Sequence, residues 1–111
     1  MAYQNIIPLR LSQDTMTTSY KVIYRAPTSS RTYVKDIDIA NTTSSSINVT
    51  VCLVPNATAV SGSNALFYAV PLPGNSTLQW TGAQILNPSD TIQVLASADG
   101  CTITITGGEA T

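Results

Sequence analysis

The sequence predicts an all-β domain, an antiparallel β-sandwich that is jelly-roll-like and has about eight short strands. Three observations predict this class. Apolar and polar residues alternate with a period of two along most of the chain, as is typical of half-buried strands. Short segments rich in Pro, Gly, Asn, Asp and Ser separate these runs at regular spacing. No segment has the apolar period and the length of a helix.

The most regular part of the chain is residues 33–54. Alternate residues from 33 to 39 share one face of a predicted strand, and alternate residues from 47 to 53 share one face of the next. Residues 41–46 between them are Asn, Thr and Ser, whose short side chains compete for backbone hydrogen bonds and favour turns. We therefore interpret residues 33–54 as one β-hairpin with a polar connection.

Residues 1–18 are predicted to form either an extended N-terminal arm or an edge strand, ahead of a single β-sandwich domain at residues 19–111. Their alternation is weak and surrounds Pro8, which cannot donate a ladder hydrogen bond. Proline restricts a strand to the edge of a sheet, whereas an extended arm could reach a neighbouring subunit. The sequence leaves both alternatives open.

The first strand of the domain is expected at residues 19–25, which are rich in β-branched and aromatic side chains. Tyr20, Val22 and Tyr24 share one face of this strand, and the alternation turns Tyr20 inward. Residues 26–31 contain proline and serine and are expected to form the following turn.

Further strands are expected after the hairpin, beyond a loop of small polar residues at 55–64 that should be exposed. Trp80 is the only tryptophan, and its expected role is to anchor the core; an interface or sugar-stacking role is the alternative. Asp99 and Gly100 form a hairpin turn signal. The strands are expected at residues 65–70, 77–81, 84–86, 91–97 and 101–106.

The composition indicates a surface that is polar but nearly uncharged. The chain has 111 residues, enough for one domain, and 43% of them are hydrophobic. Only 10% are charged, against about 25% in typical soluble proteins, and Ser and Thr supply much of the remaining polarity. Burial of the outer surface in an assembly would explain this, because interface cores are depleted in charge. The alternative is a small monomer with a hydroxyl-rich surface.

Charge and hydropathy exclude several partners. The net charge is −1 and the five basic residues are scattered, so a nucleic-acid partner is not expected. No apolar run approaches the roughly 18 residues of a membrane span, so no membrane partner is expected. The N-terminus lacks the basic and apolar regions of a signal peptide, and we expect the protein to be made and kept in a cytoplasm.

The two cysteines are predicted to be free thiols. Cys101 shares the apparent core face of its strand with Ile103, whereas Cys52 shares the opposite face of its strand with Thr50. Thiols on opposite sides of a sheet cannot form a disulfide. Free thiols are in keeping with a reducing compartment.

The sequence offers no set of catalytic residues. Histidine is absent, which removes the commonest general base and the commonest metal ligand, and no cysteine spacing suits zinc. Asp36 and Asp38 lie on one face of one strand, but a solvated face or a subunit contact explains such a pair better than a metal site or a glycosidase. We expect no enzyme activity, no cofactor and no metal.

A set of strand and turn segments runs from about residue 20 to residue 109. The segments are 24–27 (YRAP), 33–37 (YVKDI), 39–42 (IANT), 75–82 (NSTLQWTG), 86–87 (LN), 90–92 (DTI), 96–98 (ASA) and 103–107 (ITITG). Together they resemble small all-β virion proteins of tailed bacteriophages. Because these are strand and turn residues, the resemblance transfers no functional residue.

The resemblance implies a non-enzymatic structural subunit of a bacteriophage virion, assembled in the cytoplasm of the host bacterium. The first hypothesis is an auxiliary capsid subunit, of the decoration or cement type, that stabilises the shell by bridging capsomers. Its partners would be further copies of itself, as a homotrimer, and other virion proteins such as the major capsid protein. The second hypothesis is a tail, baseplate or fibre component that binds a host surface or a glycan through Trp80 or the tyrosines.

Contacts with partners are predicted for two segments that have no expected duty in the core, the N-terminal arm and residues 57–64 of the following loop. A glycan-binding role instead predicts several aromatic side chains on one exposed face, and the alternation does not place Tyr20 and Trp80 there. The predicted contact residues are Ile6, Ile7, Leu9, Arg10, Ala57, Val60 and Asn64.

Overall fold

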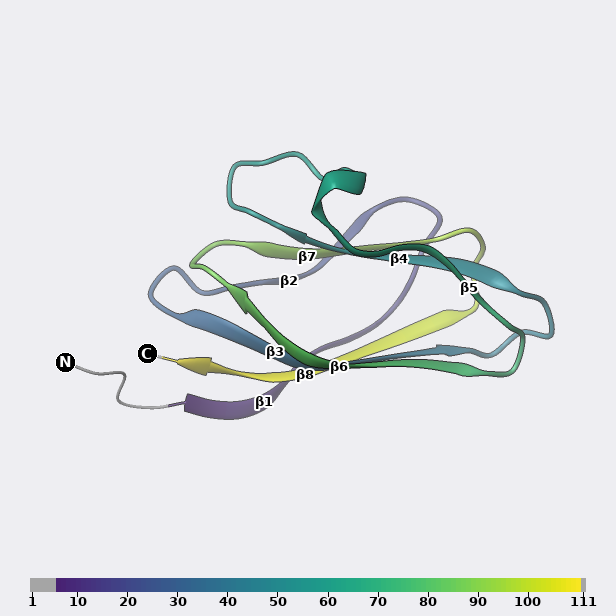
Figure 1. The fold of residues 1–111 in the computed structure, drawn as a ribbon, viewed down its shortest axis with the longest axis horizontal. Coiled ribbons are helices and arrows are strands. Elements are labelled where there is room, and N and C mark those ends of the chain that lie inside the picture. Colours follow the sequence, from purple (N-terminus) through teal and green to yellow (C-terminus); the bar gives the residue numbers. More distant parts are fainter. Residues whose placement is uncertain (1–5, 111) are drawn as a thin grey trace.

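The computed structural model describes residues 6–110, which form a two-layer β-sandwich (Figure 1). Eight strands and one turn of 3₁₀-helix make up this part of the chain, so the predicted all-β sandwich is confirmed. No helix within it is long and apolar enough to span a membrane. The elements are β1 (Ile6–Thr15), β2 (Lys21–Arg25), β3 (Arg31–Asn41), β4 (Ile47–Val54), η1 (Gly62–Asn64), β5 (Ala65–Leu72), β6 (Thr77–Leu86), β7 (Thr91–Ala96) and β8 (Cys101–Ala110).

The strands are arranged as a jelly roll. One sheet, which we call sheet A, has the order β1-β8-β3-β6, and the other, sheet B, has the order β2-β7-β4-β5. All neighbouring strands are antiparallel. At every connection except the one between β4 and β5, the chain crosses from one sheet to the other. β4 and β5 are therefore the only strands that follow each other in the described sequence and also pair.

The two predicted hairpins are therefore wrong. β3 pairs with β6 and β8 in sheet A, whereas β4 pairs with β5 and β7 in sheet B, so residues 33–54 cross from one sheet to the other. The turn at Asp99 and Gly100 likewise joins β7 of sheet B to β8 of sheet A. Alternation with a period of two tells which side chains face the core, but both sheets face the same core. It therefore cannot tell which strands are paired.

The core lies between the sheets and is built from the inward residues of the central strands. On β8 these are the alternating residues that the sequence predicts, and they are fully buried. On β3 the prediction holds for Ile37 and Ile39 only, because the register shift between Val34 and Asp36 turns Val34 inward and leaves Tyr33 and Lys35 on the outer face. Ile37 lies opposite Ile105 on one side and Trp80 on the other, which makes a continuous apolar row across sheet A. The largest fully buried side chains are Met16, Val34, Ile37, Ile39, Ile47, Val49, Val51, Val54, Leu86, Ile92, Ile103 and Ile105.

An irregularity in β2 changes the faces that were predicted for its side chains. The pairing with β7 shifts between Val22 and Tyr24, so alternate residues no longer share a face. Tyr24 packs against the core, whereas Val22 is 49% exposed. The hydroxyl of Tyr24 donates to a carboxylate oxygen of Glu109 at 2.6 Å. Burial, and to a lesser extent this hydrogen bond, raise the pKa of Tyr24 to about 12.

Strand β6 is one continuous strand rather than two short ones. The sequence predicted a break at Gly82. In the structure β6 continues through Gly82, and only its register with β3 shifts there, between Val34 and Asp36 of β3. Trp80 is half-buried on β6 and packs against the core, in keeping with the expected anchoring role.

Candidate interaction surfaces

The acidic pair on β3, Asp36 and Asp38, lies on the outer face of sheet A with no third acidic residue, histidine or cysteine grouped with it in residues 6–110. The pKa of Asp38 is raised, mainly by burial and further by the charge of the Asp36 carboxylate. One oxygen of Asp36, Oδ1, is buried and has no hydrogen-bond partner. Within residues 6–110, no group of three or more His, Cys, Asp or Glu residues lies close enough to hold a metal ion. A hard cation needs more oxygen ligands than this pair offers.

Both cysteines are free thiols, as the sequence predicted, and both are buried. Burial raises the pKa of Cys52 and the pKa of Cys101, so both remain protonated at neutral pH. The thiol of Cys52 faces away from the core and donates to the carbonyl oxygen of Ser61 at 3.6 Å. The loop at 55–64 therefore covers the outer face of sheet B, and Figure 1 shows η1 above β4 and β5.

The N-terminal contact residues lie on an edge strand. β1 pairs with β8 from Ile6 to Thr15, so the described part of the predicted arm is strand, and residues 1–5 lie outside the described residues. Ile7 is 54% exposed. The guanidinium of Arg10 is also exposed and donates to Oε1 of Gln13 at 3.2 Å. Leu9 is half-buried.

The loop contact residues lie on the other layer of the sandwich (Figure 1). Ala57 is exposed and has a positive φ of 63°, and Val60 is half-buried. The amide oxygen of Asn64 accepts the backbone N–H of Ser61 and so caps η1, which gives this side chain a local structural role. The structure therefore does not bring the two predicted contact segments together into one surface.

A groove of about 270 Å³ on the outer face of sheet B was not predicted. Tyr68 stands beside it with 62% of its surface exposed, on a bulge where the φ of Ala69 is 49°. The N–H of Ala69 donates to the hydroxyl of Thr50 at 2.8 Å, which holds the bulge. Asn48 and Ser97 add an amide and a hydroxyl to the lining. A bulge re-aims side chains, which is why alternation could not find this site.

Tyr20 also belongs to this outer face, not to the interior as the sequence predicted. The pKa of Tyr20 is raised, mainly by burial and further by the neighbouring Cys52 and Tyr68. Because Cys52 faces away from the core, Tyr20 and Tyr68 gather on the same side of sheet B. The predicted requirement for a binding face, several aromatic side chains together, is met here in part.

An apolar row crosses the outer face of sheet A at the end where β1 begins and β8 ends. Pro8 lies opposite Gly108, Gly108 opposite Tyr33, and Tyr33 opposite Ile85, which is 56% exposed. The ammonium of Lys35 lies 5.8 Å from the centre of the Tyr33 ring. A groove of about 250 Å³ runs over the two-glycine floor of this row, and its lining is almost entirely apolar.

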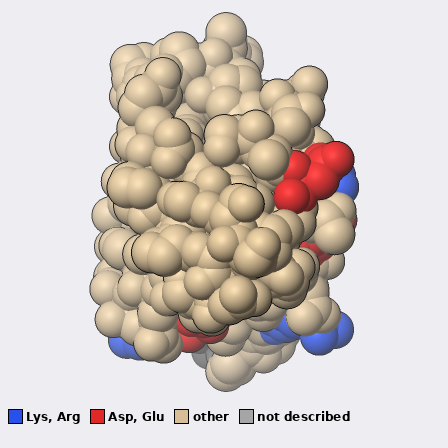
Figure 2. Space-filling view, turned by 90° about the vertical axis from the view of Figure 1, so that its right-hand side faces the viewer, with Lys and Arg blue, Asp and Glu red and all other residues tan. Residues whose placement is uncertain are grey.

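The opposite end of the sandwich is hydroxyl-rich and nearly uncharged. Figure 2 views the molecule from the right-hand side of Figure 1 and shows acidic and basic atoms mainly at the lower rim and on one side. Backbone hydrogen bonds join three turns there: the N–H of Thr42 donates to Gly100, and that of Asn75 donates to Thr43. Such a surface carries little cost of charge desolvation when it is covered.

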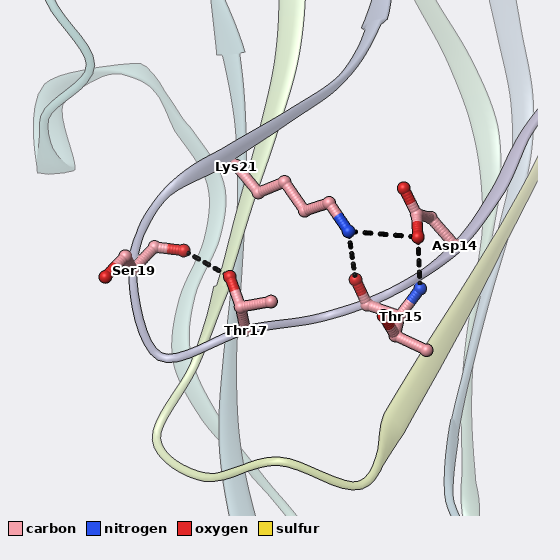
Figure 3. Close-up of polar contacts among 5 residues, drawn as sticks. All are labelled: Asp14, Thr15, Thr17, Ser19 and Lys21. Carbon is pink, nitrogen blue, oxygen red and sulfur yellow. Dashed lines mark hydrogen bonds and ion pairs between the residues drawn. The ribbon is translucent and has the colours of Figure 1, made fainter.

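One ion pair closes the connection between β1 and β2 at the side of the sandwich (Figure 3). The ammonium of Lys21 lies 3.0 Å from Oδ1 of Asp14, which also accepts the N–H of Thr15 at 2.7 Å. The hydrogen bond from Lys21 has the largest effect and lowers the pKa of Asp14, and the bond from Thr15 lowers it further. The hydroxyl of Thr17 donates to the carbonyl of Ser19 and tightens the same turn. The group is exposed and we assign it a local structural role.

No protein-family model matches the chain, and no curated protein sequence matches it. Solved structures do. A chain of the T13 viral particle of infectious bursal disease virus superposes with a TM-score of 0.52 at 11% identity, and a chain of the Gx strain of the same virus does so with 0.50 at 8%. The chain shares its fold with these viral chains. Each match covers 96% of this chain, but the chain spans only 30% of the length of either neighbour.

Proposed function

We propose that this protein is a non-enzymatic structural subunit of a virus particle. The observation that carries the proposal is the jelly-roll fold, which matches chains of viral particles over almost the whole of residues 1–111. The low share of charged residues and the exposed apolar row on sheet A support it, since both suit surfaces that neighbouring subunits cover.

The more specific proposal is an auxiliary capsid subunit of a tailed bacteriophage, of the decoration or cement type. The sequence resemblance supports this assignment. Such a subunit would bridge capsomers of the major capsid protein and act through buried contact area, at about 25 cal/mol per Å² of apolar surface. The exposed Ile7 and Arg10 on β1, with Ala57 and Val60 on the loop, would contact the neighbours, while the virion would assemble in the cytoplasm of the bacterial host.

Particles purified from the producing culture test both levels of the proposal. Quantitative mass spectrometry should find the chain in many copies per particle, and immunogold labelling should place it on the head. Ile7→Asp should lower its occupancy at least about tenfold, because a carboxylate would be buried in an apolar contact. Ser19→Asp, an exposed change in the connection between β1 and β2, is the matched control. Absence from the particles would exclude the structural role.

The groove beside Tyr68 supports a second candidate, a tail, baseplate or fibre component that binds a glycan. An exposed tyrosine ring next to amide and hydroxyl groups offers a stacking face and hydrogen bonds without charge, which suits a neutral sugar. Tyr68→Ala should then abolish binding on a glycan array while the melting temperature changes little, because the ring is mostly exposed. Tyr68→Phe, which keeps the ring, should retain most of the binding. An array without any signal for the unmodified protein would exclude this candidate.

A further inference from the structure

Strand β6 is an edge of sheet A, and its first half, residues 77–81, is unprotected. A free edge presents unpaired N–H and C=O groups, and proteins usually block it with charges, prolines, bulges or short strands. The other three edge strands carry such features, whereas β6 has no charged residue and no proline, and its register shift with β3 lies beyond residue 81. The protecting features are Pro8, Arg10 and Asp14 on β1, the shortness of β2 with Lys21 and Arg25, and Pro71 with the bulge at Ala69 on β5.

The direction of the free backbone groups follows from the pairing of β6 with β3. The N–H of Asn41 donates to the carbonyl of Ser76 at 2.9 Å, so this is a hydrogen-bonded pair. In an antiparallel ladder hydrogen-bonded pairs alternate, so Leu78 and Trp80 also bond to β3. The N–H and C=O groups of the residues between and beside them, Thr77, Gln79 and Thr81, therefore point away from the sheet.

The five residues Thr-Leu-Gln-Trp-Thr at this edge are complementary to themselves. When two copies run antiparallel about Gln79, Thr77 of one lies opposite Thr81 of the other, and Leu78 lies opposite Trp80. The threonines are exposed on the outer face, whereas Leu78 and Trp80 are half-buried on the inner face. Cross-strand threonine pairs and aromatic–aliphatic pairs both stabilise sheets.

We propose that β6 pairs antiparallel with β6 of a second copy, about a two-fold axis at Gln79, so that sheet A continues through the dimer. The second copy satisfies the outward backbone groups of Thr77, Gln79 and Thr81 and covers the exposed sides of Leu78 and Trp80. No like charges meet along the seam, because β6 has none. The pairing deepens the proposed structural role and rests on it only for its biological use.

The proposed two-fold pair differs from the homotrimer expected from the resemblance. A ring of three would need a head-to-tail contact, in which β6 pairs with a different strand of the next copy. The other edge of sheet A is β1, where Pro8 lacks an N–H and Arg10 and Asp14 bring charge. The self-complementary edge favours closure with two copies.

Gln79→Pro tests the pairing. Its N–H points away from β3, so proline removes no hydrogen bond from the monomer, yet it removes the donor at the centre of the seam. Light scattering over a concentration series should show a dimer for the unmodified protein and at least about a tenfold weaker dimer for the variant. Gln79→Thr keeps the N–H and the strand preference and should remain dimeric. Gln79→Lys places two ammonium groups at the axis and should dissociate the dimer even if the proline variant fails to fold.

Trp80, the only tryptophan, gives a second measurement on the same edge. Its fluorescence should shift to longer wavelength, and acrylamide should quench it more strongly, as the unmodified protein is diluted through the dissociation range. A monomer at every concentration, a trimer, or a dimer unaffected by Gln79→Lys would overturn the pairing. A dimer that is absent from purified particles would instead overturn the proposed function alone.

Discussion

Replacing Gly107 with alanine is expected to destabilise the protein by about 3 kcal/mol or more, enough to leave much of it unfolded. Gly107 lies on β8, a central strand of sheet A, directly opposite Val34 on β3 and Leu9 on β1. A Cβ at this position would collide with the backbone carbonyl of Tyr33 and lie 3.2 Å from Cδ1 of Leu11. The carbonyl belongs to the neighbouring strand and cannot turn aside without breaking the sheet.

Gly62→Ala is the matched control for this change. A Cβ there would touch only the ring of Tyr68, at an ordinary contact distance of 3.4 Å, and Gly62 lies in an exposed turn. We expect its free energy of unfolding to stay within about 0.5 kcal/mol of the unmodified value. Urea denaturation of the three proteins gives the comparison. Equal midpoints for Gly107→Ala and the unmodified protein would mean that β3 and β8 do not approach as closely as the structure has them.

The fold class could be predicted because it depends on local pattern. Ile37 and Ile39 on β3, and Ile103 and Ile105 on β8, are buried as their alternation predicts. The pairing of these two strands could not be predicted, since it joins residues that are 60 or more positions apart and the pattern is equally compatible with either sheet. The predicted hairpin failed for this reason.

The candidate surfaces were harder to predict because they depend on pairing and on irregular backbone. A strand is an edge only once the order of its sheet is known, so the free side of β6 could not be found from its sequence. The groove beside Tyr68 depends on a bulge, and Tyr20 lies outside because alternation is broken in β2. Pro8 is a partial exception, because it limited the N-terminal segment to an edge strand or an extended arm, and β1 is an edge strand.

Asn41→Asp is expected to destabilise the protein by about 3 kcal/mol at pH 7. Asn41 is 2% exposed, and its amide nitrogen donates to three carbonyl oxygens, of Ser45 at 2.8 Å, Leu72 at 3.1 Å and Pro73 at 3.3 Å. Its amide oxygen accepts the N–H of Thr43 at 3.0 Å. The side chain thereby ties the turn after β3 to the turn after β5. A carboxylate has the same shape but would place negative charge against three acceptors.

The pH dependence separates charge from shape. Burial against carbonyl oxygens raises the pKa of the introduced carboxyl in the folded state above its unfolded value of about 3.9. Stability relative to the unmodified protein is therefore best below about pH 4 and falls as the pH rises through the folded pKa. Asn41→Ala loses the same hydrogen bonds without gaining a charge, so its deficit should not vary with pH. Parallel pH profiles for the two variants, measured by urea denaturation, would show that the three carbonyl oxygens do not surround position 41.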